Sequence, residues 1–474
     1  MRDLFLFGIL LIFFFASFRA PYFMALGYLW VDILQPQRMA YYVFNQLPVA
    51  MIMGAGALAS FILFDKEKRL RFSLLQFLIL LLVVYSTLTT FGWAILPTTD
   101  KWDWTTKALL FSVFLPMVFT TRRRIEVALG VILFSICAIT LSGALKTLAG
   151  SSGYGSLSFI VGNNTGLFEG SILSTTALSM LPMLWWFYRH NTLLPPTKLS
   201  LLATFGISVS FLLVPIAAEA RTGFVAMGVL AAMIWWRSKR KILIGGGIFL
   251  LAVAATPFVP QSFWDRMSTI ETYQSDESAS TRIAVWKWTW DFVADHPLGG
   301  GFDIYKTNNL EIEMSRTTET DGNIDTQTFT STDRARAFHS SYFEMLGELG
   351  YPGFIIWISI VILAFWQSRV LVSREKRYRK TFEPDIPQMK DSEWAGSFGT
   401  AVSTFLPVYM AGSLFVGIAF QPAFYSIVAL MISVTYLRQE TMATAPASRT
   451  PVTQKAGTGP RSRPRRGTSS GALA

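Results

Sequence analysis

A succession of long apolar runs occupies most of the chain and constrains its fold more than any other feature. Of the 474 residues, 52% are apolar and only 15% are charged. A run of about 20 apolar residues crosses a bilayer as a helix, and only helices and closed barrels satisfy their backbone hydrogen bonds in lipid. The sequence therefore predicts an all-α polytopic membrane protein.

About twelve transmembrane helices are predicted from these runs. The first run lacks a small-residue cleavage site, so we interpret it as a retained helix. Residues Tyr22–Leu34 are short and contain Asp32, so they are either a further span or a re-entrant segment. The predicted spans are Leu4–Phe18, Leu47–Phe64, Leu74–Leu96, Ala108–Phe119, Val127–Leu148, Ser171–Phe187, Leu199–Ala217, Thr222–Trp236, Ile242–Val259, Tyr342–Trp366, Phe398–Phe420 and Ala423–Leu437.

The basic residues lie in alternate loops between the runs and explain the formal charge of +11 without nucleic acid. Cytoplasmic loops carry an excess of Lys and Arg, so these loops are predicted to face the cytoplasm and the others the periplasm. The basic groups are Lys66/Lys68/Arg69/Arg71, Arg122/Arg123/Arg124, Arg189/Lys198, Arg237/Lys239/Arg240/Lys241, the run from Arg369 to Lys380, and Arg461/Arg463/Arg465/Arg466.

Four regions follow from this pattern. Residues 1–259 are predicted as an N-terminal transmembrane bundle and residues 260–338 as a periplasmic loop domain. Residues 339–437 return to C-terminal transmembrane helices. Residues 438–474 are rich in Ala, Thr, Pro, Gly and Arg without periodicity, which predicts a disordered basic cytoplasmic tail.

The interval 260–338 is the only long polar segment, with about thirteen acidic against seven basic residues. Ile283, Trp286, Trp290 and Val293 fall at helical spacing and predict one apolar stripe of a helix. The Thr-, Asp- and Glu-rich residues after Gly301 have few apolar neighbours. They predict a mobile loop or lid.

Arg221 is the most informative candidate for chemistry. It lies on the predicted outer side and opens the run from Thr222, where a cation opposes both the helix dipole and the charge rule. The structural interpretation is a salt bridge to Glu219. The functional hypothesis is an anion site, because a guanidinium matches phosphate geometry.

His339 lies where the periplasmic interval meets a span, and Ser341 with Glu344 has the spacing of a capping box that would begin the helix. This box explains Glu344 without catalysis. Glu348 lies one turn further on, before Gly350 and Pro352, where a kink is expected. An intramembrane carboxylate is either functional or the partner of a nearby Arg.

Four further arginines of the interval are candidates to complete an anion site, although the commoner place for any one of them is the surface. They are Arg266, Arg282, Arg334 and Arg336. With Arg221, His339 and Glu348 they make the candidate set for catalysis and substrate binding.

The order of three motifs resembles the O-antigen ligase and polymerase superfamily. These are Arg221-Thr222-Gly223; Ser280-Thr281-Arg282 leading to His296-Pro297-Leu298-Gly299-Gly300-Gly301; and His339-Ser340-Ser341-Tyr342 leading to Glu348-Leu349-Gly350-Tyr351-Pro352-Gly353. The N-terminal Met1-Arg2-Asp3-Leu4-Phe5 and Gln35-Pro36-Gln37-Arg38 resemble the O-glycosylation ligases associated with exosortase systems.

The resemblance implies a bacterial inner-membrane enzyme that transfers a glycan from undecaprenyl diphosphate to an acceptor hydroxyl in the periplasm. The acceptor would be a glycan, a lipid or a protein. A glycosyl diphosphate already has a good leaving group, so catalysis needs mainly charge neutralisation and positioning.

Two other functions stay open at this stage. A polymerase of the same superfamily would use a growing lipid-linked chain as acceptor, and an anion transporter would place its ionisable residues near the middle of the membrane. No metal cofactor is expected. Asp100 and Asp103 flank Lys101, whose charge competes with a cation for these carboxylates.

Overall fold

The computed structural model describes residues 2–40, 43–148, 166–256, 277–320, 323–381 and 387–443. Its first half is helical, apart from one 3₁₀ turn. These elements are α1 (Arg2–Ser17), α2 (Phe23–Leu34), α3 (Pro36–Met39), α4 (Val43–Gln46), α5 (Val49–Leu63), α6 (Leu74–Gly92), α7 (Asp100–Val118), α8 (Arg122–Leu148), the 3₁₀ turn η1 (Gly166–Phe168), α9 (Gly170–His190), α10 (Lys198–Ala217), α11 (Arg221–Arg237) and α12 (Lys241–Ala255).

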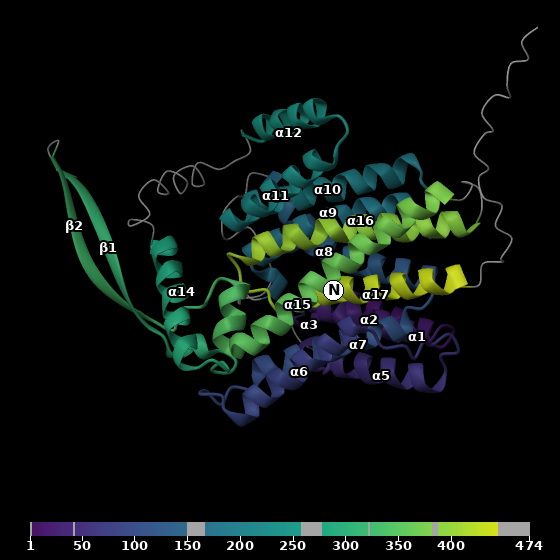
Figure 1. Cartoon of the computed structure of the whole chain (residues 1–474), viewed down its shortest axis with the longest axis horizontal. Coiled ribbons are helices and arrows are strands. Elements are labelled where there is room, and N and C mark those ends of the chain that lie inside the picture. The colour runs from purple at the N-terminus through teal and green to yellow at the C-terminus, as the bar shows by residue number, and fades with distance from the viewer. Residues whose placement is uncertain are drawn as a thin grey trace, which may run out of the picture.

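The second half holds the remaining helices and the two strands. They are α14 (Glu277–Asp295), the 3₁₀ turn η4 (Ile304–Thr307), β1 (Asn309–Thr320), β2 (Asn323–Arg334), α15 (Ser341–Thr381), α16 (Pro387–Ser413) and α17 (Pro422–Ala443). Most helices pack into one bundle, and the two strands extend from one end of it beside α14 (Figure 1).

The predicted apolar runs form helices, as expected for a multi-pass membrane protein. Among the described helices, four are long and apolar enough to cross a membrane: Leu74–Gly92, Arg122–Leu145, Lys198–Ala217 and Ser341–Arg379. The peripheral helix α12 carries large apolar side chains on its surface, including Ile242 and Phe249. An exposed apolar face of this kind suits lipid.

The short run at Tyr22–Leu34, whose role the sequence left open, forms α2 inside the bundle. Ten of its twelve residues are buried, and it packs against α1, α5 and α8. It ends at Gln35, whose positive φ of 50° stops the helix, and Pro36 begins the next one.

The Thr-rich part of the interval is an antiparallel hairpin, so the prediction of an irregular loop is wrong. Strand β1 pairs with β2 along its whole length, from Asn309 opposite Arg334 to Thr320 opposite Asn323. Thr is a good strand former because its branched side chain fits the pleated surface. The hairpin is a departure from the predicted all-α fold.

The buried face of α14 also differs from the predicted apolar stripe. Ile283 and Trp290 are 52% and 59% exposed, whereas Val285 and Thr289 are fully buried. Val285 packs with Ile304, Leu310 and Phe338 in a small core of its own beneath the hairpin. The helix therefore buries the face that carries Val285, Thr289 and Val293 and leaves Ile283 and Trp290 open, so Val293 is the fully buried member of the predicted stripe.

The last helix continues beyond the predicted start of the C-terminal tail. It runs to Ala443, and its Glu440 carboxylate accepts a hydrogen bond from Nε of Arg69 at 2.9 Å. This contact ties the end of α17 to the loop between α5 and α6. The rest of the predicted tail lies outside the described residues.

Candidate active site at the start of helix α15

Two glycine motifs that are far apart in the sequence interlock at the first turns of α15. The helix is broken at Gly350, whose φ is +62°, and the turn after α14 fits into this break. Gly300 N donates to Gly347 O at 3.0 Å, Gly301 N to Glu348 O at 2.9 Å and Tyr351 N to Pro297 O at 3.0 Å.

No side chain fits between these two backbones. A Cβ on Gly350 would lie 2.3 Å from Pro297 O, and one on Gly299 would lie 2.5 Å from Glu348 O. The positive φ values of both residues, +88° at Gly299, also favour glycine. The kink expected near Gly350 is confirmed, and the close backbone contact gives it a physical cause.

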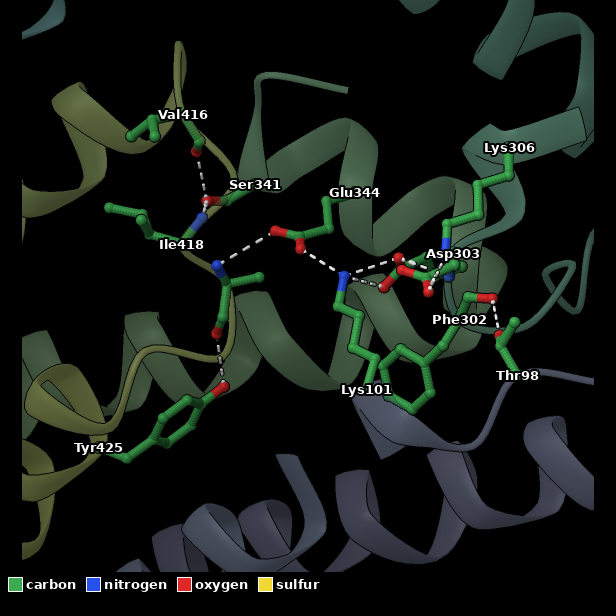
Figure 2. Close-up of polar contacts among 12 residues, drawn as sticks. Thr98, Lys101, Phe302, Asp303, Lys306, Ser341, Glu344, Val416, Ile418 and Tyr425 are labelled. Atoms are coloured by element: carbon green, nitrogen blue, oxygen red, sulfur yellow. Dashed lines mark hydrogen bonds and ion pairs between the residues drawn. The ribbon is translucent and has the colours of Figure 1, made fainter. Parts of the chain in front are cut away.

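A buried ion cluster lies directly beneath this junction (Figure 2). Lys101 Nζ donates to Glu344 Oε1 at 2.6 Å and to both oxygens of Glu348 at 2.7 and 2.8 Å. The backbone N–H of Asp303 donates a further bond to Glu348 Oε1 at 3.0 Å. The Glu348 side chain is 0% exposed, and three donated contacts fix it between α7, α15 and the glycine turn.

Glu344 and Ser341 connect α15 to the loop before α17, and the predicted capping box is wrong. Ser341 is the first residue of the helix; its hydroxyl donates to Val416 O at 2.9 Å and accepts from Ile418 N at 2.8 Å. Glu344 Oε2 accepts from Ala419 N at 3.3 Å. The carboxylate reaches across to a neighbouring loop because Lys101 holds its other oxygen.

Apolar rings enclose the cluster and raise the strength of its electrostatic interactions. Lys101 Nζ lies 5.6 Å from the ring centroids of both Phe302 and Phe420, and these two rings are themselves almost fully buried. Charges in such a site cost free energy unless they are paired. The cluster therefore fixes the position of the α15 start relative to α7.

A second group of polar candidates lies just before the first residue of the same helix. His339 has a positive φ of 47°, and its side chain is exposed. Partial desolvation of the ring, followed by the positive charges of Arg282 and Arg336, lowers the pKa of His339 below its ordinary value. The structure thus brings Arg282 near Arg336 and His339, which follow it by more than 50 residues in the sequence.

The loop that carries His339 is held on both sides. Asn308 Nδ2 donates to Arg336 O at 2.7 Å, and Asn308 Oδ1 accepts from Arg336 N at 3.0 Å. Trp286 Nε1 donates to Phe338 O at 2.9 Å, and the Trp286 ring stacks on Phe343 at 5.0 Å. These contacts fix the backbone around the imidazole.

The other two candidate arginines of the interval are Arg334 and Arg266, and no described contact joins them to His339. Arg334 is exposed at the end of β2, where its Nε donates to Asn309 Oδ1 at 3.3 Å. That contact lies at the base of the hairpin. Arg266 lies outside the described residues.

Arg221 begins α11, as the sequence predicts. The start of α11 packs tightly on α9 and α10, because a Cβ on Gly223 would lie within 2.8 Å of both Pro215 and Ser174. Helix α11 also packs on α16. Arg221 thus belongs to the part of the bundle formed by α9, α10 and α16, whereas His339 belongs to the part formed by α14 and α15.

The two aspartates considered for metal binding lie at the start of α7. Asp100 is the first residue of the helix, and Asp103 pairs with Lys107 at 2.6 Å on the exposed surface. Within the described ranges, His, Cys, Asp and Glu form no group of three or more placed to hold a metal ion.

Lys101 is the functional candidate that sequence reasoning missed. From the sequence, Lys101 is expected only to compete with a cation for the carboxylates of Asp100 and Asp103. The charge rule that singled out Arg221 applies equally to Lys101, because it is a base on a short loop predicted to face outward. The same rule would have predicted an acidic partner for it.

Comparison with known protein families agrees with the resemblance in the sequence. Residues 203–358 match the family described as O-Antigen ligase. Residues 1–192 match a family of unknown function, DUF5935. No curated protein matches the chain.

The O-antigen ligase domain contains nearly all of the candidate site. It ends within α15 and includes Arg221, Arg282, Arg336, His339, Glu344 and Glu348. Lys101 comes from the region of unknown function. The match supports membership of the O-antigen ligase superfamily and, with the apolar helices, a multi-pass membrane protein with a ligase-type transferase domain.

Proposed function

We propose that this protein is a membrane glycosyltransferase that moves a glycan from undecaprenyl diphosphate to an acceptor hydroxyl on the periplasmic side of the bacterial inner membrane. The observation that supports the proposal is that α14, which carries Arg282, contacts the loop that holds Arg336 and His339 just before α15, within the O-antigen ligase domain. The imidazole can accept the proton of an acceptor hydroxyl, and the two guanidiniums can bind a diphosphate next to it.

In the proposed step, the acceptor hydroxyl oxygen attacks the anomeric carbon of the glycan. The bond between that carbon and the diphosphate oxygen breaks, and the electron pair leaves with undecaprenyl diphosphate. The hydroxyl proton passes to the neutral imidazole of His339, whose lowered pKa keeps it unprotonated near neutral pH. No oxidant, reductant or further reactant is needed.

The arginines have the role of neutralising the diphosphate. Arg282 is half-buried on α14. Asn308 holds the backbone of Arg336, and the Arg336 guanidinium pairs with the Asp333 carboxylate, so the diphosphate would take the place of Asp333 beside this charge. Arg221 is proposed to contact the same diphosphate from the α11 side. Preorganised charges of this kind stabilise a developing leaving group more than mobile ones do.

Glu348 is assigned a positioning role in place of the catalytic one predicted from the sequence. Its carboxylate is fully buried, and Lys101 and Asp303 N engage its oxygens. It acts through Lys101 and the glycine turn, which set the position of the first turns of α15. His339 precedes these turns by two residues.

The proposed partners are an undecaprenyl-diphosphate-linked glycan as donor and a glycan, lipid or protein as acceptor. The N-terminal motifs that resemble exosortase-associated O-glycosylation ligases favour a protein acceptor. A polymerase would use the same donor and the same site. Membrane lipids surround the protein, and no nucleic acid and no metal cofactor are part of the proposal.

A strain that lacks the gene tests the proposal. We expect lipid-linked glycan to accumulate while transferred glycan disappears, and wild-type protein to restore both. If single repeat units are still transferred and only long chains are lost, the protein is the polymerase. If neither glycan pool changes, the proposed function is wrong.

A further inference from the structure

A small pocket lies where α8 and α16 begin and α17 ends. In Figure 1 the end of α17 lies on the side of the bundle away from α14. Its volume is about 90 Å³. It is lined by Arg122, Asp391, Trp394, Leu437, Arg438 and Thr441, together with the small side chain of Ala395. None of these residues takes part in the site described above.

Arg438 is the unusual residue of this pocket. It is only 8% exposed, and its Nε is buried without a hydrogen-bond partner. Within the part of the chain that the structure describes, its guanidinium makes no ion pair. A buried charged donor left in this state costs free energy, and a ligand that accepts from the guanidinium would offset this cost.

The charges around Arg438 favour an anion. Arg374 adds a second positive charge nearby, and Glu375 and Tyr378 also face it. The Glu375 carboxylate is already engaged by Arg379, at 2.7 Å. Glu375 therefore pairs with Arg379 and does not fully neutralise the charge of Arg438.

Arg122 supplies the second guanidinium of the pocket. Its Nε donates to Glu126 at 2.9 Å and its Nη2 to His190 O at 2.9 Å, while it lies 5.2 Å from the Trp394 ring centroid. Its Nη1 has only a long contact to Asp391, at 3.8 Å. Two guanidiniums against one carboxylate leave the lining with a net positive charge.

We propose that this pocket binds a phosphate group, carried either by an anionic lipid headgroup or by a soluble phosphate ester. The guanidinium fork matches phosphate oxygens. The pocket lies at the end of the bundle with the basic loops, which the charge rule assigns to the cytoplasm, where anionic lipids are found. Leu437 and Trp394 provide an apolar wall beside the phosphate.

The test uses the full-length protein in a neutral detergent with two probes, dioctanoyl-phosphatidylglycerol and glycerol 1-phosphate, and measures binding by calorimetry. Arg438→Gln should weaken binding at least about tenfold, because it removes a charged donor from a buried position. Arg123→Gln is the matched control. It removes the same charge from an exposed position at the start of α8 and should leave binding unchanged.

The two probes separate the sources of the phosphate. Binding of the lipid alone identifies a headgroup site, and binding of both identifies a site for soluble phosphate as well. If neither probe binds, or if Arg123→Gln weakens binding as much as Arg438→Gln, the proposal is overturned.

A second variant keeps the test valid if Arg438→Gln does not fold. Thr441→Phe retains both guanidiniums but fills the mouth of the pocket from the half-buried last turn of α17. It should abolish binding of whichever probe binds the wild-type protein. Unaltered binding by a folded Thr441→Phe protein would show that the phosphate lies elsewhere.

Discussion

Replacing Lys101 with Met should destabilise the protein strongly, because it leaves two buried carboxylates without their cation. The Glu344 and Glu348 side chains are 10% and 0% exposed, and Lys101 itself is 15% exposed. Removing one partner of a buried pair costs about 3–5 kcal/mol. Part of this cost is recovered if one carboxylate takes up a proton, so we expect a loss of about 3 kcal/mol in the free energy of unfolding.

Lys107→Met on the same helix is the matched control. Lys107 pairs with Asp103 at the same distance of 2.6 Å, but the two side chains are 60% and 53% exposed. An exposed pair of this kind is worth about 0.2–1 kcal/mol. Denaturant unfolding of the detergent-solubilised proteins, followed by circular dichroism, compares the two variants directly.

A double variant tests whether the cost comes from the cluster. Adding Glu348→Gln to Lys101→Met removes one of the two unpaired charges, while the Gln carbonyl can still accept from Asp303 N. The double variant should be more stable than the sum of the single losses by about 0.5–3 kcal/mol. The reasoning is refuted if Lys101→Met is no more destabilising than Lys107→Met, or if the two changes simply add.

Three further predictions follow from the site. His339→Ala should lower turnover of bound donor about 10²–10⁴-fold with little change in donor binding. Because its pKa is lowered, the wild-type rate should fall only below about pH 6.5, and a wild-type rate that falls already above that pH would contradict the assignment. Gly350→Ala should prevent stable folding, seen as loss of a thermal unfolding transition, whereas Gly228→Ala, with nothing within 4 Å of its Cβ, should unfold like the wild type. Transfer should survive EDTA and the Asp100→Asn/Asp103→Asn change; loss with EDTA and rescue by Mg²⁺ would make these aspartates the leading site.

Much of the helical architecture could be predicted because lipid forces apolar runs into helices. The hairpin was missed although the sequence carries its signal. Asp321-Gly322 separates two Thr-rich runs of equal length, and a two-residue Asp-Gly loop is a strong hairpin pattern. Low apolar content outweighed this local pattern in the prediction.

The face of α14 could not be chosen from periodicity alone. Ile283, Trp286 and Trp290 fit a stripe as well as Val285 and Thr289 do, since aromatic and β-branched residues occur on two sides of the helix. The burial of Val285 depends on contacts with residues up to 53 positions later. Tertiary packing decided between two patterns that are equivalent in the sequence.

The identity of the two partners of Lys101 could not be predicted for a related reason. Lys101 lies 243 and 247 residues from its two partners, and no spacing rule connects residues so far apart. The capping-box spacing gives Glu344 an adequate local role, so the sequence gives no reason to predict it as a partner of Lys101. Arg282 and His339 could be predicted because each lies in a recognisable motif, and Arg336 because it is one of the few arginines of the polar interval.

Reconstituted transfer tests the central claim most directly. Full-length protein is placed in liposomes with an undecaprenyl-diphosphate-linked glycan and an acceptor. Undecaprenyl diphosphate should be released at the same rate at which the glycosylated acceptor is formed. Arg221→Ala should insert normally but transfer nothing, and Arg221→Lys should recover little because a bidentate phosphate contact needs the planar guanidinium. Normal transfer by a well-inserted Arg221→Ala protein, or no transfer by the wild type, would contradict the account.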